Sequence, residues 1–322
     1  MKPGIRLGLF GLVLVTLFGA AAFTASVVVP DRVAQESAKD DKNGSEHSGH
    51  GSNKDKASDA NALVLSLGQD GYRLTEVDTP GEAESNGELS LVVIGPDGKP
   101  VTDFDVQHDK ELHLIVVRAD GQQFRHVHPE LAKDGTWSLP WRWNEGGTYR
   151  VFADFIPAQT GKGLTLSTAV QVAGSYEPVA PAPAKTANVH DYEVAVHGDL
   201  TVGEPSELTM TVSKDGEPVT ELQPYLAAFG HLVTLREGDL AYLHAHPHGD
   251  APKPDETSGP DIIFEVNAPT PGQYLLYLDF KINGEVHTAP LVLNATASGA
   301  TDDDSGTHDP SHDEEGSGHD HD

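Results

Sequence analysis

The chain has 322 residues, with 21 Lys and Arg against 50 Asp and Glu, and a formal net charge of −29. So acidic a chain lacks the basic patch that nucleic-acid binding needs. Cysteine is absent, which excludes disulfides, thiolate metal sites and thiol chemistry, and the two methionines are too few for a methionine-rich Cu(I) site. The length allows two domains of ordinary size plus tails.

The N-terminal residues have the pattern of a membrane segment. Lys2 and Arg6 lead into an apolar run that ends at Val29. At about 1.5 Å per residue, this run is long enough to cross a hydrocarbon core of about 30 Å. We predict that residues 1–30 form a transmembrane signal anchor with its basic end cytoplasmic, which places the bulk of the chain outside the cell membrane. Ala20-Ala21-Ala22 leaves signal-peptidase cleavage open.

Three further segments have the composition of tethers rather than domains. Residues 31–60 are rich in Gly, Ser, Lys and Asp and are predicted to be a disordered tether. Alternating Pro and Ala make residues 175–188 an extended linker. Residues 297–322 are expected to be a disordered, acidic, His-rich tail that either collects metal weakly or only solubilises the protein.

The remaining two segments, residues 61–174 and 189–296, consist of short alternating or apolar runs between turn residues. No long segment with a period of 3.6 occurs outside the N-terminal run. A Gly-x-Tyr sequence ending at Tyr149 and again at Tyr274 is similar to the tyrosine corner of immunoglobulin-like domains. We predict an all-β protein with two tandem immunoglobulin-like antiparallel β-sandwiches after the single transmembrane helix.

One stretch occurs twice with identical histidine spacing. Residues 113–129 read HLIVVRADGQQFRHVHP, and residues 231–247 read HLVTLREGDLAYLHAHP. A two-residue hairpin loop at Asp120-Gly121 would place His113 opposite His128. His126 would then lie on the same face, because side chains alternate with period 2. A three-residue loop would instead turn one strand's histidines away.

The second copy keeps its three histidines on one face whether the loop is Glu237-Gly238 or Gly238-Asp239. Neighbouring pairs about 5–8 Å apart could converge on one ion at about 2.0–2.1 Å per bond. We therefore predict two metal-binding triads. Their members are His113, His126 and His128 in the first copy and His231, His244 and His246 in the second.

Asp154 and Asp279 occupy matching positions and are candidates for a fourth ligand, although a hydrogen-bonded Asp that fixes a neighbouring loop is the favoured reading. His287 is an additional candidate near Asp279, so the second site is favoured if only one is real. The histidines could also be structural, since histidines near a tight turn can hydrogen-bond the backbone. His108, His190 and His197 are expected to be ordinary surface or core residues.

The two HxHP stretches resemble a duplicated β-sandwich module of bacterial secreted and envelope proteins that are often described as heavy-metal-binding. The resemblance covers both folded segments and implies an envelope location and a link to metal.

We therefore predict a binding protein for Cu(II) or Zn(II) that serves buffering, resistance or delivery, with an envelope metal transporter or acceptor protein as a possible partner. No nucleophile elbow, HExxH or phosphate loop occurs, so no catalytic role is predicted. A metal-free envelope scaffold or adhesion module is the main alternative, and a metallo-enzyme with an open coordination position is another.

Overall fold

The computed structural model describes residues 65–297, and every helix or strand assigned there is a β-strand, as predicted. No helix within these residues is long and apolar enough to cross a membrane. The predicted signal anchor and tether, and the predicted tail from residue 298 on, lie outside the described residues. Both sandwiches belong to one compact unit, Lys54–Asp322.

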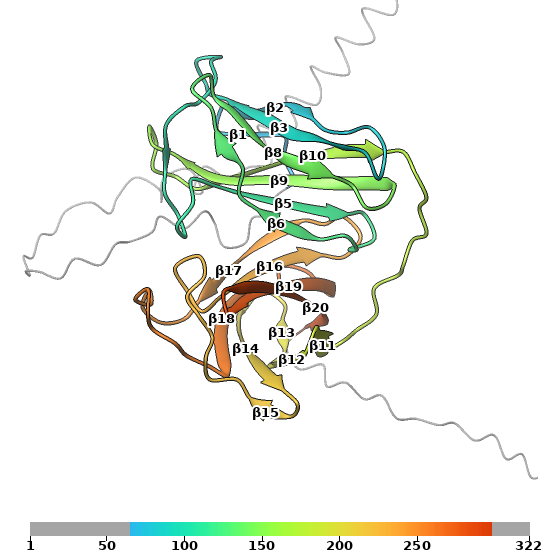
Figure 1. Cartoon of the computed structure of the whole chain (residues 1–322), viewed down its shortest axis with the longest axis vertical. Helices are drawn as coiled ribbons and strands as arrows, with labels where there is room; N and C mark the ends of the chain where they lie inside the picture. Colours follow the sequence, from blue (N-terminus) through green and yellow to red (C-terminus); the bar gives the residue numbers. More distant parts are fainter. Residues whose placement is uncertain (1–64, 298–322) are drawn as a thin grey trace, which may run out of the picture. The chain divides into compact units, whose positions relative to one another are not determined.

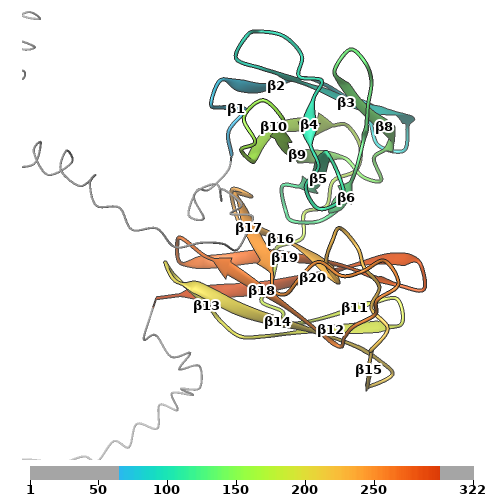
Figure 2. The same cartoon turned by 90° about the vertical axis from the view of Figure 1, so that its left-hand side faces the viewer.

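The first sandwich has two antiparallel sheets (Figure 1, Figure 2). One sheet has the order β1 (Gly68–Gln69), β2 (Tyr72–Asp78), β3 (Asn86–Ile94), β8 (Thr136–Arg142) and β7 (Glu130–Leu131). The other has the order β10 (Leu164–Val172), β9 (Gly147–Pro157), β5 (Leu112–Arg118) and β6 (Arg125–Val127), with β4 (Phe104–Asp105) paired to β9. Alternate side chains of the two sheets, among them Trp137 and Phe155, form the core.

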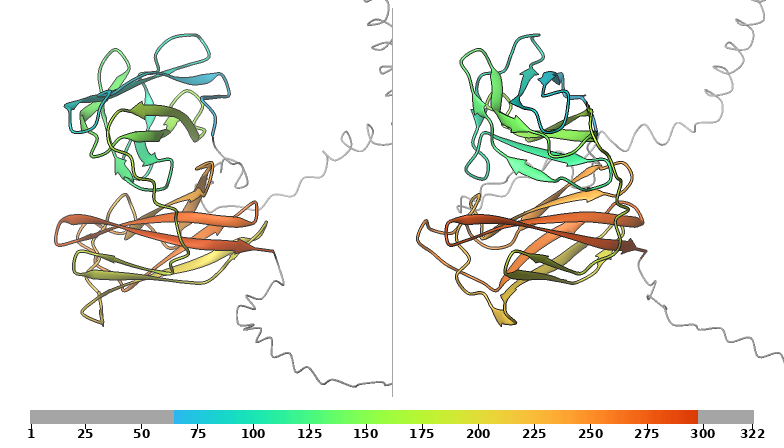
Figure 3. Two further views of the ribbon diagram at one scale, coloured as in Figure 1. Left: turned by 90° about the vertical axis from the view of Figure 1, so that its right-hand side faces the viewer. Right: turned by 45° about the vertical axis from the view of Figure 1, so that its right-hand side comes forward.

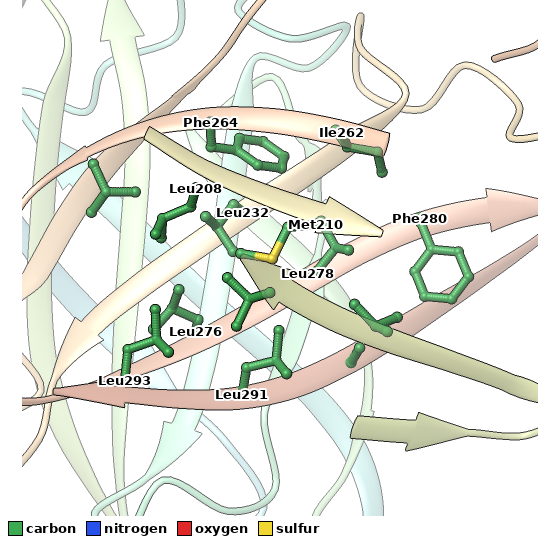
Figure 4. Close-up of a cluster of buried hydrophobic side chains, with 14 of the residues drawn as sticks. Leu208, Met210, Leu232, Ile262, Phe264, Leu276, Leu278, Phe280, Leu291 and Leu293 are labelled. Carbon is green, nitrogen blue, oxygen red and sulfur yellow. The ribbon is translucent and has the colours of Figure 1, made fainter. Parts of the chain in front are cut away.

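The second sandwich repeats this arrangement, but its strands form one continuous ladder. The order is β11 (Thr186–Val189), β12 (Tyr192–His197), β14 (Pro205–Lys214), β18 (Asp261–Asn267), β17 (Tyr242–Pro247), β16 (Gly230–Arg236), β19 (Gly272–Ile282), β20 (Glu285–Thr296) and β13 (Leu200–Thr201), with β15 (Glu217–Pro218) on β14. Figure 3 shows its two layers, and Figure 4 shows the apolar side chains, such as Leu208 and Phe264, that fill the space between them. Strand β11 begins inside the range predicted to be linker.

Strand β17 joins the two layers because it changes partner along its length. Tyr242 to His244 pair with β16, whereas Ala245 to Pro247 pair with β18. In the first sandwich the matching segment is broken around Pro129, and β6 and β7 pair with different sheets. The two copies of the HxHP stretch therefore differ where the histidine pair lies.

A tyrosine corner is present in both repeats. The Tyr149 hydroxyl donates to the carbonyl of Glu145 at 2.8 Å, and that of Tyr274 donates to Thr270 at 2.9 Å. In each case the acceptor lies four residues upstream of the tyrosine. These hydrogen bonds support the immunoglobulin-like architecture that the Gly-x-Tyr sequences indicate.

The predicted two-residue loop at Asp120-Gly121 is wrong, although its register is correct. The amide of Arg118 donates to the carbonyl of Gln122 at 2.9 Å, which closes a three-residue loop. Such a loop alone would place the side chains of the second strand on the opposite face of the sheet. Gln123, with φ of +56°, adds one more residue and restores the register, so Ile115 pairs with His126. The ladder then brings His113 opposite His128, as predicted.

The second copy closes with a four-residue loop, because the amide of Arg236 donates to the carbonyl of Ala241. Val233 then pairs with His244, which is the register of the Gly238-Asp239 alternative.

The β5–β9 face of the first sandwich and the β16–β19 face of the second share one buried apolar cluster. Ile115 and Phe152 contribute from the first repeat, and Val233 and Leu275 from the second. The rings of Phe124 and Tyr277 stack with centroids 3.9 Å apart. These contacts hold together the strands that carry the histidines and aspartates.

Candidate metal centre

The first predicted triad is assembled in the structure. His113 lies on β5, His126 lies on β6, and His128 directly follows β6. His113 Nδ1 is 3.1 Å from His126 Nε2 and 3.2 Å from His128 Nε2. The period of the two strands and the restored register explain why all three rings share one face. One nitrogen from each of the three rings thus lies within 4.8 Å of the other two.

Hydrogen bonds on the far side of two of these rings determine which nitrogen carries the proton. His113 Nε2 donates to the carbonyl of Gln107 at 3.0 Å, and His126 Nδ1 donates to Asp279 Oδ2 at 2.8 Å. A carbonyl and a carboxylate accept but do not donate. His113 Nδ1 and His126 Nε2 therefore both carry lone pairs and face each other, an arrangement that needs a proton or a cation between them.

Burial keeps two of the three rings neutral. Burial, followed by the neighbouring His126, lowers the pKa of His113 to about 4. The same two causes lower the pKa of His128 to about 3. At neutral pH both rings are therefore free of the extra proton and offer a lone pair.

The geometry fits a transition-metal ion. Nitrogens 3.1 and 3.2 Å apart, each about 2.05 Å from an ion, would subtend angles of about 100° there, close to tetrahedral. Neutral imidazoles suit Zn(II) and Cu(II). Two buried carboxylates lie close by, Asp154 on β9 opposite His113 and Asp279 on β19 opposite His231. Both can offset the charge of a divalent ion.

The second predicted triad does not converge among the described residues. Where β17 leaves β16 for β18, His246 comes to lie opposite Glu265 and is exposed. His244 faces Asp154, with Nε2 3.5 Å from Oδ1. The second copy is the one favoured if only one site is real, whereas the structure brings together the three histidines of the first copy.

His231 lies with the first triad rather than with its own repeat's pair. Its ring centroid is 4.7 Å from that of His126, and its ring is nearly parallel to that of His113 at 5.6 Å. Together with Asp279 and His126 it forms a second group of possible ligand atoms, all within 4.8 Å of one another. The site therefore draws on both repeats.

The aspartates contact histidines of the other repeat. Asp279 accepts from His126 and from the hydroxyl of Thr288. Asp154 faces His244 and accepts from the hydroxyl of Thr165 at 2.6 Å. Burial acts to raise the pKa of Asp154, but the hydrogen bond and charge of His244, together with the hydrogen bond from Thr165, outweigh burial and lower this pKa. Neither aspartate belongs to the first triad, and Asp279 belongs to the second group of possible ligands.

Three other histidines have ring neighbours that the sequence did not indicate. His287 is in neither group of possible ligands within residues 65–297, and its Nδ1 lies 3.0 Å from Nδ1 of His190. The ring of His108 packs against His113 and His231, at 6.1 and 5.7 Å between centroids. Two successive positive φ values, at His108 and Asp109, shape this loop, and no residue pattern indicated it.

Several solved structures are similar in part. Invasin, a bacterial integrin-binding protein, is 12% identical, with 70% of this chain and 39% of that chain covered and a TM-score of 0.21. The D0-D1 domain of intimin is 12% identical, with 70% and 96% covered and a TM-score of 0.19. A putative membrane anchored protein from Corynebacterium diphtheriae is 9% identical, with 71% and 59% covered and a TM-score of 0.22. Likeness of this extent carries no conclusion about function.

No curated protein matches the chain. A family model described as "Domain of unknown function (DUF8832)" matches twice, over residues 67–174 and 187–297. These two matches confirm the internal duplication and together cover more than half of the sequence. The chain therefore belongs to the DUF8832 family and carries two copies of its domain in tandem.

Proposed function

We propose that this protein binds a divalent transition-metal ion, Cu(II) or Zn(II), through His113, His126 and His128. The observation that carries the proposal is the pair of lone pairs on His113 Nδ1 and His126 Nε2, held 3.1 Å apart by hydrogen bonds on the far side of each ring. A carboxylate behind a ligating histidine is a common arrangement at metal sites, and it makes the ring a stronger ligand.

The role we assign to this site is metal buffering, resistance or delivery rather than catalysis. The predicted signal anchor would place the site outside the cell membrane, where an envelope metal transporter or acceptor protein could receive the ion. The net charge of −29 would draw cations towards the protein.

A metal-free envelope scaffold or adhesion module is the second candidate function. The observation in its favour is His244, which contacts Asp154 of the other repeat and belongs to neither group of possible ligands in residues 65–297. If His126 played the same part, the reciprocal His–Asp contacts would serve only to hold the two sandwiches together.

Metal titration separates the two candidates. The full chain would carry Gln at the six histidines outside residues 65–297, so that the tether and tail do not contribute; these are His47, His50, His308, His312, His319 and His321. Cu(II) and Zn(II) affinities would be measured by competition with a chelator of known affinity.

The matched pair of variants is His128→Gln and His246→Gln, which change the same position of the two repeats. His128→Gln should weaken binding by more than the roughly 10- to 100-fold that loss of an outer hydrogen-bond partner costs. His246→Gln should leave the affinity unchanged. Absence of binding, or equal effects of the two variants, would support the scaffold.

A further inference from the structure

The two groups of possible ligands share one residue, His126, and use opposite edges of its ring. Nε2 faces Nδ1 of His113, whereas Nδ1 faces Asp279. The third member of the second group, His231, has a buried Nδ1 atom for which residues 65–297 provide no hydrogen-bond partner. Such an atom is costly unless it is satisfied.

We propose that His126, His231 and Asp279 form a second position for a divalent transition-metal ion, bridged to the first by the imidazole ring of His126. The proposal rests on the proposed function, since the first ion is the one held by the triad. Two nitrogens and one carboxylate oxygen are the donor set, which suits Cu(II) or Zn(II).

The two oxygens of Asp279 already have separate tasks. Oδ1 accepts from the hydroxyl of Thr288, and Oδ2 faces His126. An ion held by Oδ2 would take the place of the proton on His126 Nδ1. That proton would be released to solvent, and the ring would become an imidazolate. The imidazolate and Asp279 then carry two negative charges towards the two ions. Because a proton must leave, the second ion should bind more weakly than the first.

The duplication provides an internal comparison for this second position. The counterparts of His126, His231 and Asp279 in the other repeat are His244, His113 and Asp154. These three do not converge in the described part of the chain, and His113 Nδ1 is directed to the triad instead. Within the described residues, only the set of His126, His231 and Asp279 forms this second position, and His231 is its member with an unsatisfied nitrogen.

Copper titration followed by electron paramagnetic resonance tests the bridge. The protein is the full chain with Gln at the six outer histidines. The first equivalent of Cu(II) should give the signal of an isolated ion. The second should reduce that signal, because two Cu(II) ions that share one imidazolate are magnetically coupled. Two equivalents with additive, uncoupled signals, or saturation at one equivalent, would overturn the bridge.

Two variants locate the second ion. His231→Gln should take up only one equivalent, whereas His244→Gln should keep both binding steps and the coupling. If His231→Gln keeps both steps, the assignment is wrong. Uptake of one ion without a second refutes this inference and leaves the proposed function standing, and failure to bind any ion refutes both.

Discussion

Replacing Asp279 by Asn tests whether the carboxylate makes His126 a ligand. The side chain of Asp279 is 2% exposed, and that of His126 is 1% exposed, so water cannot replace their hydrogen bond. An amide oxygen is a weaker acceptor than a carboxylate. An inverted amide would instead donate to Nδ1 and move the proton to Nε2, which removes the lone pair. We expect the first metal ion to bind about 10- to 100-fold more weakly, which is about 1.4–2.7 kcal/mol.

The matched control is Asp154→Asn. Asp154 lies at the same position of the first repeat and accepts from Thr165 as Asp279 accepts from Thr288. Its histidine partner, His244, is outside the triad. Asp154 therefore influences the first ion only as a nearby charge, and its loss should cost less affinity. Both variants would be compared with the parent by chelator competition at pH 7.5. Equal losses, or full affinity in Asp279→Asn, would refute the role given to the carboxylate.

Three further outcomes are expected. In metal-free protein the free energy of unfolding should fall as the pH is lowered from about 6.5 to about 4. The reason is that His113 and His128 take up protons in this range in the unfolded chain but not in the folded chain, where their pKa values are about 4 and about 3. Urea unfolding across this range should show a smaller decrease for His128→Gln than for the parent, and an equal decrease would contradict the burial argument. Tyr277→Phe removes the hydrogen bond from its hydroxyl to the carbonyl of Gly121 and should cost about 0.5–1.5 kcal/mol in the same assay, whereas no change would show that this contact between the repeats adds nothing. Leu208→Ala empties part of the core of the second sandwich and should cost about 2–5 kcal/mol, and a cost below this range would mean that the two layers close over the gap.

Local patterns were sufficient for much of the architecture. Alternation and turn residues predict two antiparallel sandwiches, and matched motifs predict the duplication that the family matches confirm. The first triad could also be predicted, because a period of 2 and an even register put His113, His126 and His128 on one face of a hairpin. The loop itself was predicted incorrectly, and the triad survives because Gln123 restores the register.

Tertiary structure alone decided which histidines meet. In the second repeat β17 changes partner at Ala245, so His246 follows β18 although the local sequence matches that of the first copy. The pairing of His126 with Asp279, 153 residues away, exists because two sheet faces share an apolar cluster. The sequence pattern of one strand can indicate which face of the sheet a side chain occupies. It contains no information about the face that packs against it, because that contact depends on the shape and register of both repeats together.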